Sequence, residues 1–185
     1  MVINMSHFEK QLSTRSIYDG RIVHLRTDTV ELENGEQTLR EVIDHPGGVG
    51  IVALDREDNV LLVRQFRYPF SQELLEIPAG KLERGEDHYV CGLRELQEET
   101  GYSAKTFQYL GCLYPTPAYL TEITHLYYAR DLTAGGQKLD EDEFLSVLRL
   151  PFAQAVQMVL DGGIPDAKTQ VGLLRVDALR RQGKL

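Results

Sequence analysis

The sequence is short of positive charge. Its 185 residues include 20 Lys and Arg against 28 Asp and Glu, which gives a formal net charge of −8. Non-specific nucleic-acid binding depends on Lys and Arg to neutralise phosphates, so this balance argues against nucleic acid as a partner. An acidic protein can still bind an anionic substrate where metal ions and a few arginines bridge the two.

Cysteine is also scarce, and Cys91 and Cys112 are the two examples. The first falls on a predicted helix and the second in a strand-like run. Neither has the spacing of metal ligands, so we expect two free thiols in the core.

Long apolar runs are absent. The first residues, MVINMSHFEKQ, lack the apolar stretch of a secretory leader, and no later run approaches the length needed to span a membrane. We therefore expect a cytoplasmic location and no membrane partner.

Two common catalytic patterns are missing as well. No G-x-S-x-G element supplies a serine nucleophile. The glycine-rich run 47–50 precedes a strand and lacks a GK[ST] ending, which argues against a phosphate loop. The histidines are scattered without ligand spacing, and we expect ordinary structural roles for all of them: His7, His24, His45, His88 and His125.

The length and the 42% share of hydrophobic residues fit one globular domain with a small appendage. Strand-like alternation covers residues 16–27 and 28–32, and Asn34-Gly35 is a strong hairpin signal before a strand at 37–44. The break His45-Pro46-Gly47-Gly48 follows. We predict an N-terminal antiparallel sheet in residues 1–45 and a main domain in residues 46–185.

The rest of the chain alternates between strand and helix patterns, which predicts an α/β (α+β) fold. We expect a hairpin of strands 49–54 and 60–65, turning at Asp58-Asn59. Proline is favoured at the first helical position, which suits Pro151. Further strands are expected at 73–77, 105–113, 122–129 and 145–150, and helices at 89–100, 152–160 and, capped by Asp166, 167–181.

The most informative stretch runs from Gly80 to Tyr102 and reads GKLERGEDHYVCGLRELQEETGY. Asp87 is a good helix N-cap, and Gly101 stands where a left-handed helix terminator belongs. Three carboxylates, Glu95, Glu98 and Glu99, then share one helix face.

Like charges at this spacing repel one another unless something positive neutralises them. Arg94 can supply one charge through its i,i+4 relation to Glu98, and Mg²⁺ or Mn²⁺ suits the remaining carboxylates. A bare E-x-x-E-E is more often a solvated helix face. The fixed residues around it, Gly80, Glu86, Arg94 and Gly101, argue against that interpretation here. A chance match to all seven single-residue positions is below roughly one in 10⁸ per start site.

This stretch resembles the Nudix box, G-x5-E-x7-R-E-U-x-E-E-x-G-U, at every position. The resemblance implies an α/β/α sandwich with a mixed central sheet, in which a loop-helix-loop element binds divalent metal. It also implies an enzyme that hydrolyses a nucleoside diphosphate linked to another moiety.

Outside the box the chain resembles the ADP-ribose pyrophosphatase and nucleoside diphosphate sugar hydrolase branch. The resemblance rests on Arg40-Glu41, Gln65-Phe66-Arg67, Glu76-Ile77-Pro78-Ala79-Gly80, Tyr114-Pro115-Thr116-Pro117 and the acidic run 140–143 before Phe144. Pro117 matches a proline that marks the ADP-ribose subfamily. The products would be a nucleoside monophosphate and a sugar phosphate, and a homodimer through the N-terminal sheet is expected.

The resemblance also implies roles in the metal site, which would hold two or three Mg²⁺ or Mn²⁺ ions. Gly80, Glu86 and Arg94 would orient the loop and the helix. A glutamate on a late loop would be the general base, for which we choose Glu141, with Glu98 as the alternative. The implied metal ligands are the Ala79 carbonyl, Glu95, Glu98, Glu99 and, additionally, Glu143.

The implied substrate contacts come from six residues: Arg21, Arg40, Glu41, Arg67, Thr116 and Pro117. Arg21 stands where some relatives carry an aromatic that stacks on adenine, so a preference for GDP-mannose or a broad range of nucleotide sugars stays open.

The sequence argues against four other functions. A non-catalytic sensor usually loses a box glutamate, and this chain keeps them all. A nucleotide triphosphatase would not need the N-terminal sheet or Pro117, and an RNA-cap hydrolase would want a more basic surface. An isomerase would need a pocket cysteine, and Cys91 on the box helix is not obviously placed for that.

Overall fold

The computed structural model describes residues 7–139 and 144–185. Glu141 and Glu143, the expected base and additional metal ligand, lie outside the described residues and stay predictions. The chain divides into two compact units. The first is the N-terminal part up to Pro46 together with Thr116–Glu122, and the second comprises Gly47–Pro115 and Ile123–Leu185.

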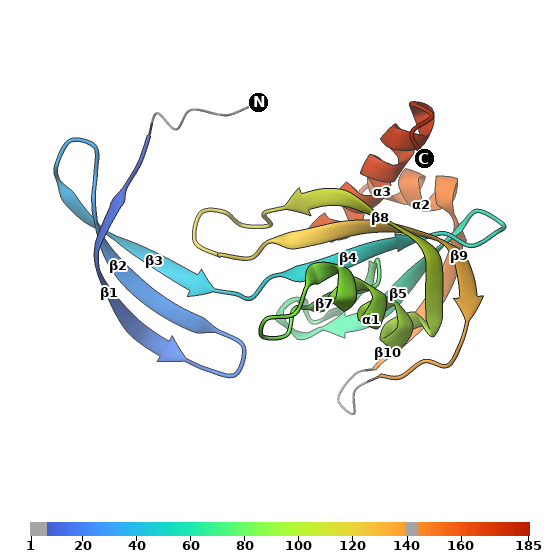
Figure 1. Cartoon of the computed structure of the whole chain (residues 1–185), viewed down its shortest axis with the longest axis horizontal. Coiled ribbons are helices and arrows are strands. Elements are labelled where there is room, and N and C mark those ends of the chain that lie inside the picture. The colour runs from blue at the N-terminus through green and yellow to red at the C-terminus, as the bar shows by residue number, and fades with distance from the viewer. Residues whose placement is uncertain (1–6, 140–143) are drawn as a thin grey trace. The chain divides into compact units, whose positions relative to one another are not determined.

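The first unit is built on the expected small antiparallel sheet, drawn in blue in Figure 1. Its strands are β1 (Lys10–Asp19), β2 (His24–Glu31) and β3 (Gln37–Asp44), in the order β1-β2-β3. Gly35 takes a φ of 83° in the β2–β3 turn, as the Asn-Gly signal predicts. The expectation of one strand over residues 16–27 is wrong, because the chain turns between Asp19 and His24 and Gly20 N–H donates to Val23 O.

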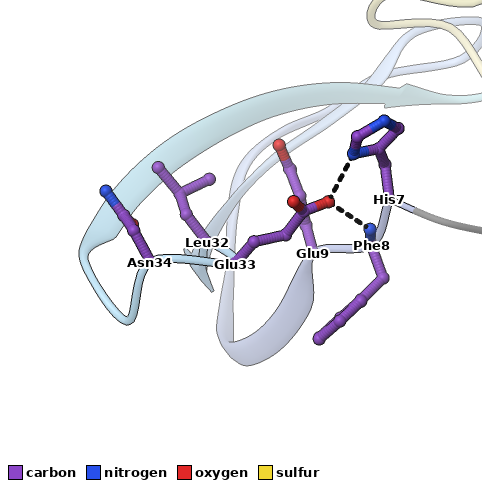
Figure 2. A pocket seen from close by; sticks show the side chains of 6 residues that line it. All are labelled: His7, Phe8, Glu9, Leu32, Glu33 and Asn34. Atoms are coloured by element: carbon purple, nitrogen blue, oxygen red, sulfur yellow. Dashed lines mark hydrogen bonds and ion pairs between the residues drawn. The ribbon is translucent and has the colours of Figure 1, made fainter.

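The β2–β3 turn of this unit contacts the beginning of the described chain. There the carboxylate of Glu33 accepts hydrogen bonds from the Phe8 amide at 3.0 Å and pairs with the His7 ring at 2.9 Å (Figure 2). Together with Leu32 and Asn34, among others, these residues line a hollow on the surface of the first unit. No residue of the box or of the expected substrate set lines it.

The segment Thr116–Glu122 joins the first unit by backbone pairing, which the sequence did not predict. Ile43 N–H donates to Tyr119 O at 2.8 Å, and Thr121 N–H donates to Ile43 O at 3.0 Å. His45 N–H also donates to the Thr121 hydroxyl at 2.8 Å. These bonds extend the edge of β3 with a strand-like partner from late in the chain.

The second unit contains two sheets. The mixed sheet has the order β7-β4-β9-β8, and its β4–β9 pair is parallel. The other sheet, β10-β5-β6, is antiparallel. The strands are β4 (Gly48–Ala53), β5 (Asn59–Arg67), β6 (Gln72–Glu76), β7 (Ala79–Lys81), β8 (Tyr102–Leu113), β9 (Thr124–Ala134) and β10 (Leu145–Pro151); a short 3₁₀ helix, η1 (Tyr68–Phe70), follows β5.

The expected β4–β5 hairpin is wrong. The two strands follow one another but belong to different sheets, and a single bridge, Leu54 with Val60, joins them. β4 is apolar and buried along its whole length, and β5 is apolar and buried from Val60 to Val63, before its more exposed end at residues 64–67. Such strands need partners on both edges, and β4 finds them in β7 and β9 while β5 finds them in β6 and β10.

Three helices cover the sheets in the expected α/β/α arrangement (Figure 1). Val49 and Ile51 of β4 pack with Leu96 of α1 (His88–Thr100) in one core. Val52 packs in the other core, with residues of α2 (Phe152–Leu160) and α3 (Ala167–Arg181). The side chains of β4 therefore alternate between two helical layers. Pro151 is the N-cap of α2 rather than its first helical residue. None of the helices in the described parts is both long and apolar enough to cross a bilayer.

Candidate active site

Helix α1 begins and ends where the box spacing predicts. The Asp87 carboxylate accepts hydrogen bonds from Tyr89 N–H at 2.8 Å and Val90 N–H at 3.4 Å, which caps the N-terminus. Gly101 takes a φ of 74° and its N–H donates to Gln97 O, which closes the C-terminus. The register of every side chain on the helix is thereby set.

The three box carboxylates lie on the face of α1 that packs toward the sheet. Glu95 and Glu99 are only 8% and 3% exposed, although both are glutamates. Charged side chains are almost never buried so far without partners. Glu98, three residues after Glu95 and next to Glu99 in the sequence, is more open, with 36% of its side chain exposed.

Arg94 is the cation that holds this cluster together. Its Nη1 contacts Glu95 at 2.7 Å and Glu98 at 2.9 Å, which confirms the expected i,i+4 pair. Its Nε and Nη2 each contact the Glu86 carboxylate at 2.9 Å. The hydrogen bonds from Arg94, and next the amide of Glu83, lower the pKa of Glu86 to about 2, against the cost of its burial. Arg94 thus ties the loop before the helix to the helix itself.

The strand before the loop is pressed against the same face. Ala79 N–H donates to Glu99 Oε2 at 2.8 Å. At Gly80 an added Cβ would lie 1.9 Å from the Glu95 carboxyl carbon, so only glycine leaves room for that carboxylate. The box glycine is therefore required by close approach and not by a turn.

The donors suit a hard divalent cation. Carboxylate oxygens and a backbone carbonyl are what Mg²⁺ and Mn²⁺ take, and the space at Gly80 admits the Glu95 head group beside β7. Within the described parts of the chain, no three His, Cys, Asp or Glu side chains converge on a common metal position, because Glu95 and Glu98 are turned to Arg94. Residues that fit the ion are thus present, and binding it would draw both carboxylates away from the arginine.

A second charged group lies next to the box, around Glu76. Arg67 meets Glu76 through two bonds of 2.7 Å, from Nε and Nη2. Lys168, from the first turn of α3, contacts the same carboxylate. Within this group, we expected from the sequence a substrate contact at Arg67 only. Glu76 was recognised as part of the segment 76–80 but not as the partner of Arg67, and Lys168 was missed because it is 92 positions from Glu76 and no short motif links the two.

The other expected substrate residues lie in the first unit. Arg40 and Glu41 line a hollow of about 550 Å³ with Tyr119, and Arg40 is paired with Glu9. Arg21 is exposed in the β1–β2 connection. Thr116 accepts turn hydrogen bonds through its carbonyl, and the neighbouring Pro117 is exposed. Arg67, in contrast, belongs to the second unit.

Two histidines that looked unrelated in the sequence meet in the second unit. The rings of His88 and His125 stack with centroids 3.9 Å apart. His88 pairs with the Tyr127 hydroxyl at 2.5 Å, and His125 with the Tyr109 hydroxyl at 3.0 Å. The expected ordinary roles did not include this contact, since it depends on β8 and β9 lying beside the start of α1.

Comparison with known families identifies both parts of the chain. Residues 44–169 match the model of the NUDIX domain. Residues 9–43 match the nucleoside diphosphate sugar hydrolase N-terminal domain. The boundary between the two matches falls at the end of β3, close to the break that separates the expected domains.

Characterised relatives are similar over most of their length. The methanol dehydrogenase activator of Bacillus methanolicus is 41% identical over 89% of this chain and 90% of its own. The ADP-ribose pyrophosphatase of Bacillus subtilis is 40% identical over 87% and 88%. The GDP-mannose pyrophosphatase of Yersinia enterocolitica is 34% identical over 91% and 93%. The crystal structure of an ADP compounds hydrolase has the same fold, with a TM-score of 0.82 at 23% identity, covering 96% of this chain and 97% of that one.

Proposed function

This chain belongs to the Nudix family, and we propose that it hydrolyses the diphosphate bond of ADP-ribose or a related nucleoside diphosphate sugar. The observation that carries the proposal is the intact acidic cluster of α1, with Glu95 seated over Gly80 and Glu99 held by the Ala79 amide. The N-terminal match to nucleoside diphosphate sugar hydrolases points to the same substrate class.

The reaction adds water to one phosphorus and breaks its bond to the bridging oxygen, so that ADP-ribose gives AMP and ribose 5-phosphate. A divalent cation, when bound, neutralises diphosphate charge and lowers the pKa of water. Glu95, Glu98, Glu99 and the Ala79 carbonyl would hold it, and we propose Mg²⁺ or Mn²⁺, two or three per site. Arg94 would then keep its two bonds to Glu86 and so hold the loop in place.

A carboxylate must take the proton of the attacking water. We propose Glu141 for this role, with Glu98, the most exposed of the three box carboxylates, as the alternative. Glu141→Gln should lower kcat by about 10²–10⁴-fold, the usual contribution of a general base. Turnover near the wild-type rate would transfer the role to Glu98.

Arg67 is proposed to bind the diphosphate or the terminal ribose. Its guanidinium is always charged and forms charge-assisted bonds to phosphate oxygens. Arg40, Glu41 and Tyr119 line a hollow in the first unit that suits the base, whose identity the sequence leaves open.

We also propose that the chain forms a homodimer through its N-terminal sheet. Every residue of β1 is exposed, including Leu12, Ile17 and Tyr18. A three-stranded sheet with apolar side chains left in water is marginally stable alone, and a second copy could cover it. Light scattering should give twice the chain mass, and a monomer mass would exclude the dimer. The cytoplasmic location stays an expectation from the sequence.

One assay tests the central proposal. The protein, with Mg²⁺ or Mn²⁺, is incubated with ADP-ribose, GDP-mannose, ADP-glucose, NADH, diadenosine polyphosphates and 8-oxo-dGTP, and the products are identified by mass. Paired monophosphates from ADP-ribose support the proposal. Faster cleavage of GDP-mannose would favour the second candidate, which the similarity to GDP-mannose pyrophosphatases supports. No turnover of any compound would favour a non-catalytic sensor.

A further inference from the structure

The charged group around Glu76 is more elaborate than an ion pair needs to be. The Glu76 side chain is only 1% exposed, yet it meets two cations, Arg67 from β5 and Lys168 from α3. A single arginine with two bonds of 2.7 Å already satisfies the charge and both oxygens of this carboxylate. The second cation therefore calls for an explanation beyond neutralisation.

Lys168 connects Glu76 to the start of α3. Its ammonium group also contacts Asp166 at 3.0 Å, and its side chain is only 17% exposed. Asp166 caps the helix by accepting from Thr169 N–H at 2.9 Å, and the Thr169 hydroxyl accepts from Ile77 N–H at 2.9 Å. The helix N-terminus and the strand connection that carries Ala79 are thus locked together at this point.

The arginine is held by one edge only. Its Nε and Nη2 face Glu76, while its Nη1 has no hydrogen-bond partner in the described parts of the chain. Its side chain remains 40% exposed. Glu76 stands three residues before Ala79, whose N–H donates to the Glu99 carboxylate at 2.8 Å, so Arg67 is bound to the same short stretch of chain that contacts the box carboxylates. The hydrogen bond to Glu76 is also the main cause that raises the pKa of Arg67. The open edge of Arg67 is therefore available to an anion beside those carboxylates.

We propose that Lys168 is a positioning residue of the active site, which fixes Glu76 so that Glu76 in turn presents the open edge of Arg67 to the substrate diphosphate. The inference rests on the proposed function, because it takes Arg67 as a diphosphate contact. Two cations and two carboxylates, Arg67, Lys168, Glu76 and Asp166, balance in charge. Without Lys168 the Glu76 carboxylate keeps both bonds from Arg67, but its Oε2 loses the second cation and with it the connection to Asp166 and the start of α3.

The test measures binding without requiring turnover. The probe is the α,β-methylene analogue of ADP-ribose, whose Kd is determined by calorimetry for the wild type and for Lys168→Met, Lys168→Arg, Glu76→Gln and the Lys168→Met/Glu76→Gln double variant. Lys105→Met is the matched control, since Lys105 is exposed on β8. Thermal melts identify any variant that is not folded, and steady-state kinetics on ADP-ribose separate kcat from KM.

Lys168→Met should weaken analogue binding by about tenfold, the scale of one misdirected charged hydrogen bond, and Lys168→Arg should restore most of it. Glu76→Gln should have a similar effect. The Kd of the double variant should lie within about twofold of the Kd of the weaker-binding single variant, because Lys168 acts through Glu76. KM should rise more than kcat falls, while Lys105→Met stays like the wild type.

Three results would overturn the role of Lys168. One is a folded Lys168→Met with wild-type Kd, which would leave the lysine a purely structural part. Another is multiplicative loss in the double variant, which would mean that Lys168 reaches the ligand directly. The third is a wild-type protein that does not bind the analogue, which would remove the proposed function too. If the wild type binds the analogue but does not cleave ADP-ribose, the proposed function fails alone, and the double variant still decides the role of Lys168.

Discussion

The substitution Gly80→Ala should lower the catalytic rate far more than the stability, and the distances around Gly80 give the size of the displacement. The new Cβ would lie 1.9 Å from the carboxyl carbon of Glu95 and 2.0 Å from its Oε1. Ordinary contact begins at 3.4 Å, so the carboxylate must retreat by roughly 1.5 Å. The backbone at Gly80 is in an extended strand and accepts alanine, so the whole effect falls on the position of Glu95.

The expected loss is large in rate and small in stability. A displacement of about 1 Å at a catalytic group can cost 10²-fold in rate, and we expect kcat to fall by at least about that factor. The clashing atoms belong to the end of a flexible side chain, which can swing away at the loss of its contact with Arg94. A partly exposed ion pair contributes up to about 1 kcal/mol, so the melting temperature should move by only a few degrees.

The assay compares initial rates on ADP-ribose, Mg²⁺ titrations and thermal melts. Gly162→Ala is the matched control: Gly162 has a φ of 77° and nothing within 4 Å of an added Cβ. It should lose about 1 kcal/mol of stability through backbone strain and keep its kcat. A folded Gly80→Ala enzyme with near wild-type kcat and Mg²⁺ dependence would refute the assignment of Glu95 as a metal ligand.

Three further predictions follow from single side chains. Burial, and next the charge of the stacked His88, lower the pKa of His125 below its usual 6.5, so the unfolded state binds the proton more readily than the folded state. The contribution of neutral His125 to stability is therefore complete above pH 6.5 and declines as the pH falls below it. His125→Phe should flatten the dependence of the melting temperature on pH in this range. Burial raises the pKa of the Cys91 thiol to about 12, so a thiol reagent should label no more than Cys112 until the protein is unfolded, and labelling of native Cys91 would contradict the packing. Glu86→Gln weakens the ion pair with Arg94 that joins the loop to the helix. The Mg²⁺ concentration for half-maximal rate should therefore rise by about 10–100-fold. An unchanged Mg²⁺ titration would show that Glu86 does not orient the metal ligands.

The box helix could be predicted to within one residue, as 89–100 against the observed His88–Thr100, because its determinants are local. Asp87 caps it, Gly101 ends it, and the i,i+4 relation of Arg94 and Glu98 follows from helical geometry alone. The last helix was equally accessible, since Asp166 caps α3 at its expected start. In each case the deciding contacts lie within four residues along the chain.

The pairing of strands that are distant in the sequence could not be predicted from local contacts. Nothing in the runs 49–54 and 60–65 distinguishes a hairpin from two strands of separate sheets, because residues 49–54 and 60–63 are apolar without alternation. The choice depends on β7, β9, β6 and β10, which compete for their edges. The addition of Thr116–Glu122 to the first unit is of the same kind: its backbone bonds to Ile43 are invisible to any local pattern.

The candidate site likewise has one part that a local motif encodes and one part that is assembled from distant segments. Its acidic half is one helix and the strand before it, so one continuous motif encodes it. Its basic half is assembled from β5, β6 and α3, and Glu76 and Lys168 are 92 positions apart in the sequence. A hydrolase of diphosphates needs both halves, since carboxylates that gather cations do not themselves orient an anion. Nudix chains with an intact box should therefore differ in substrate use mainly through the non-local half, and in this chain we propose the group around Glu76 for that part.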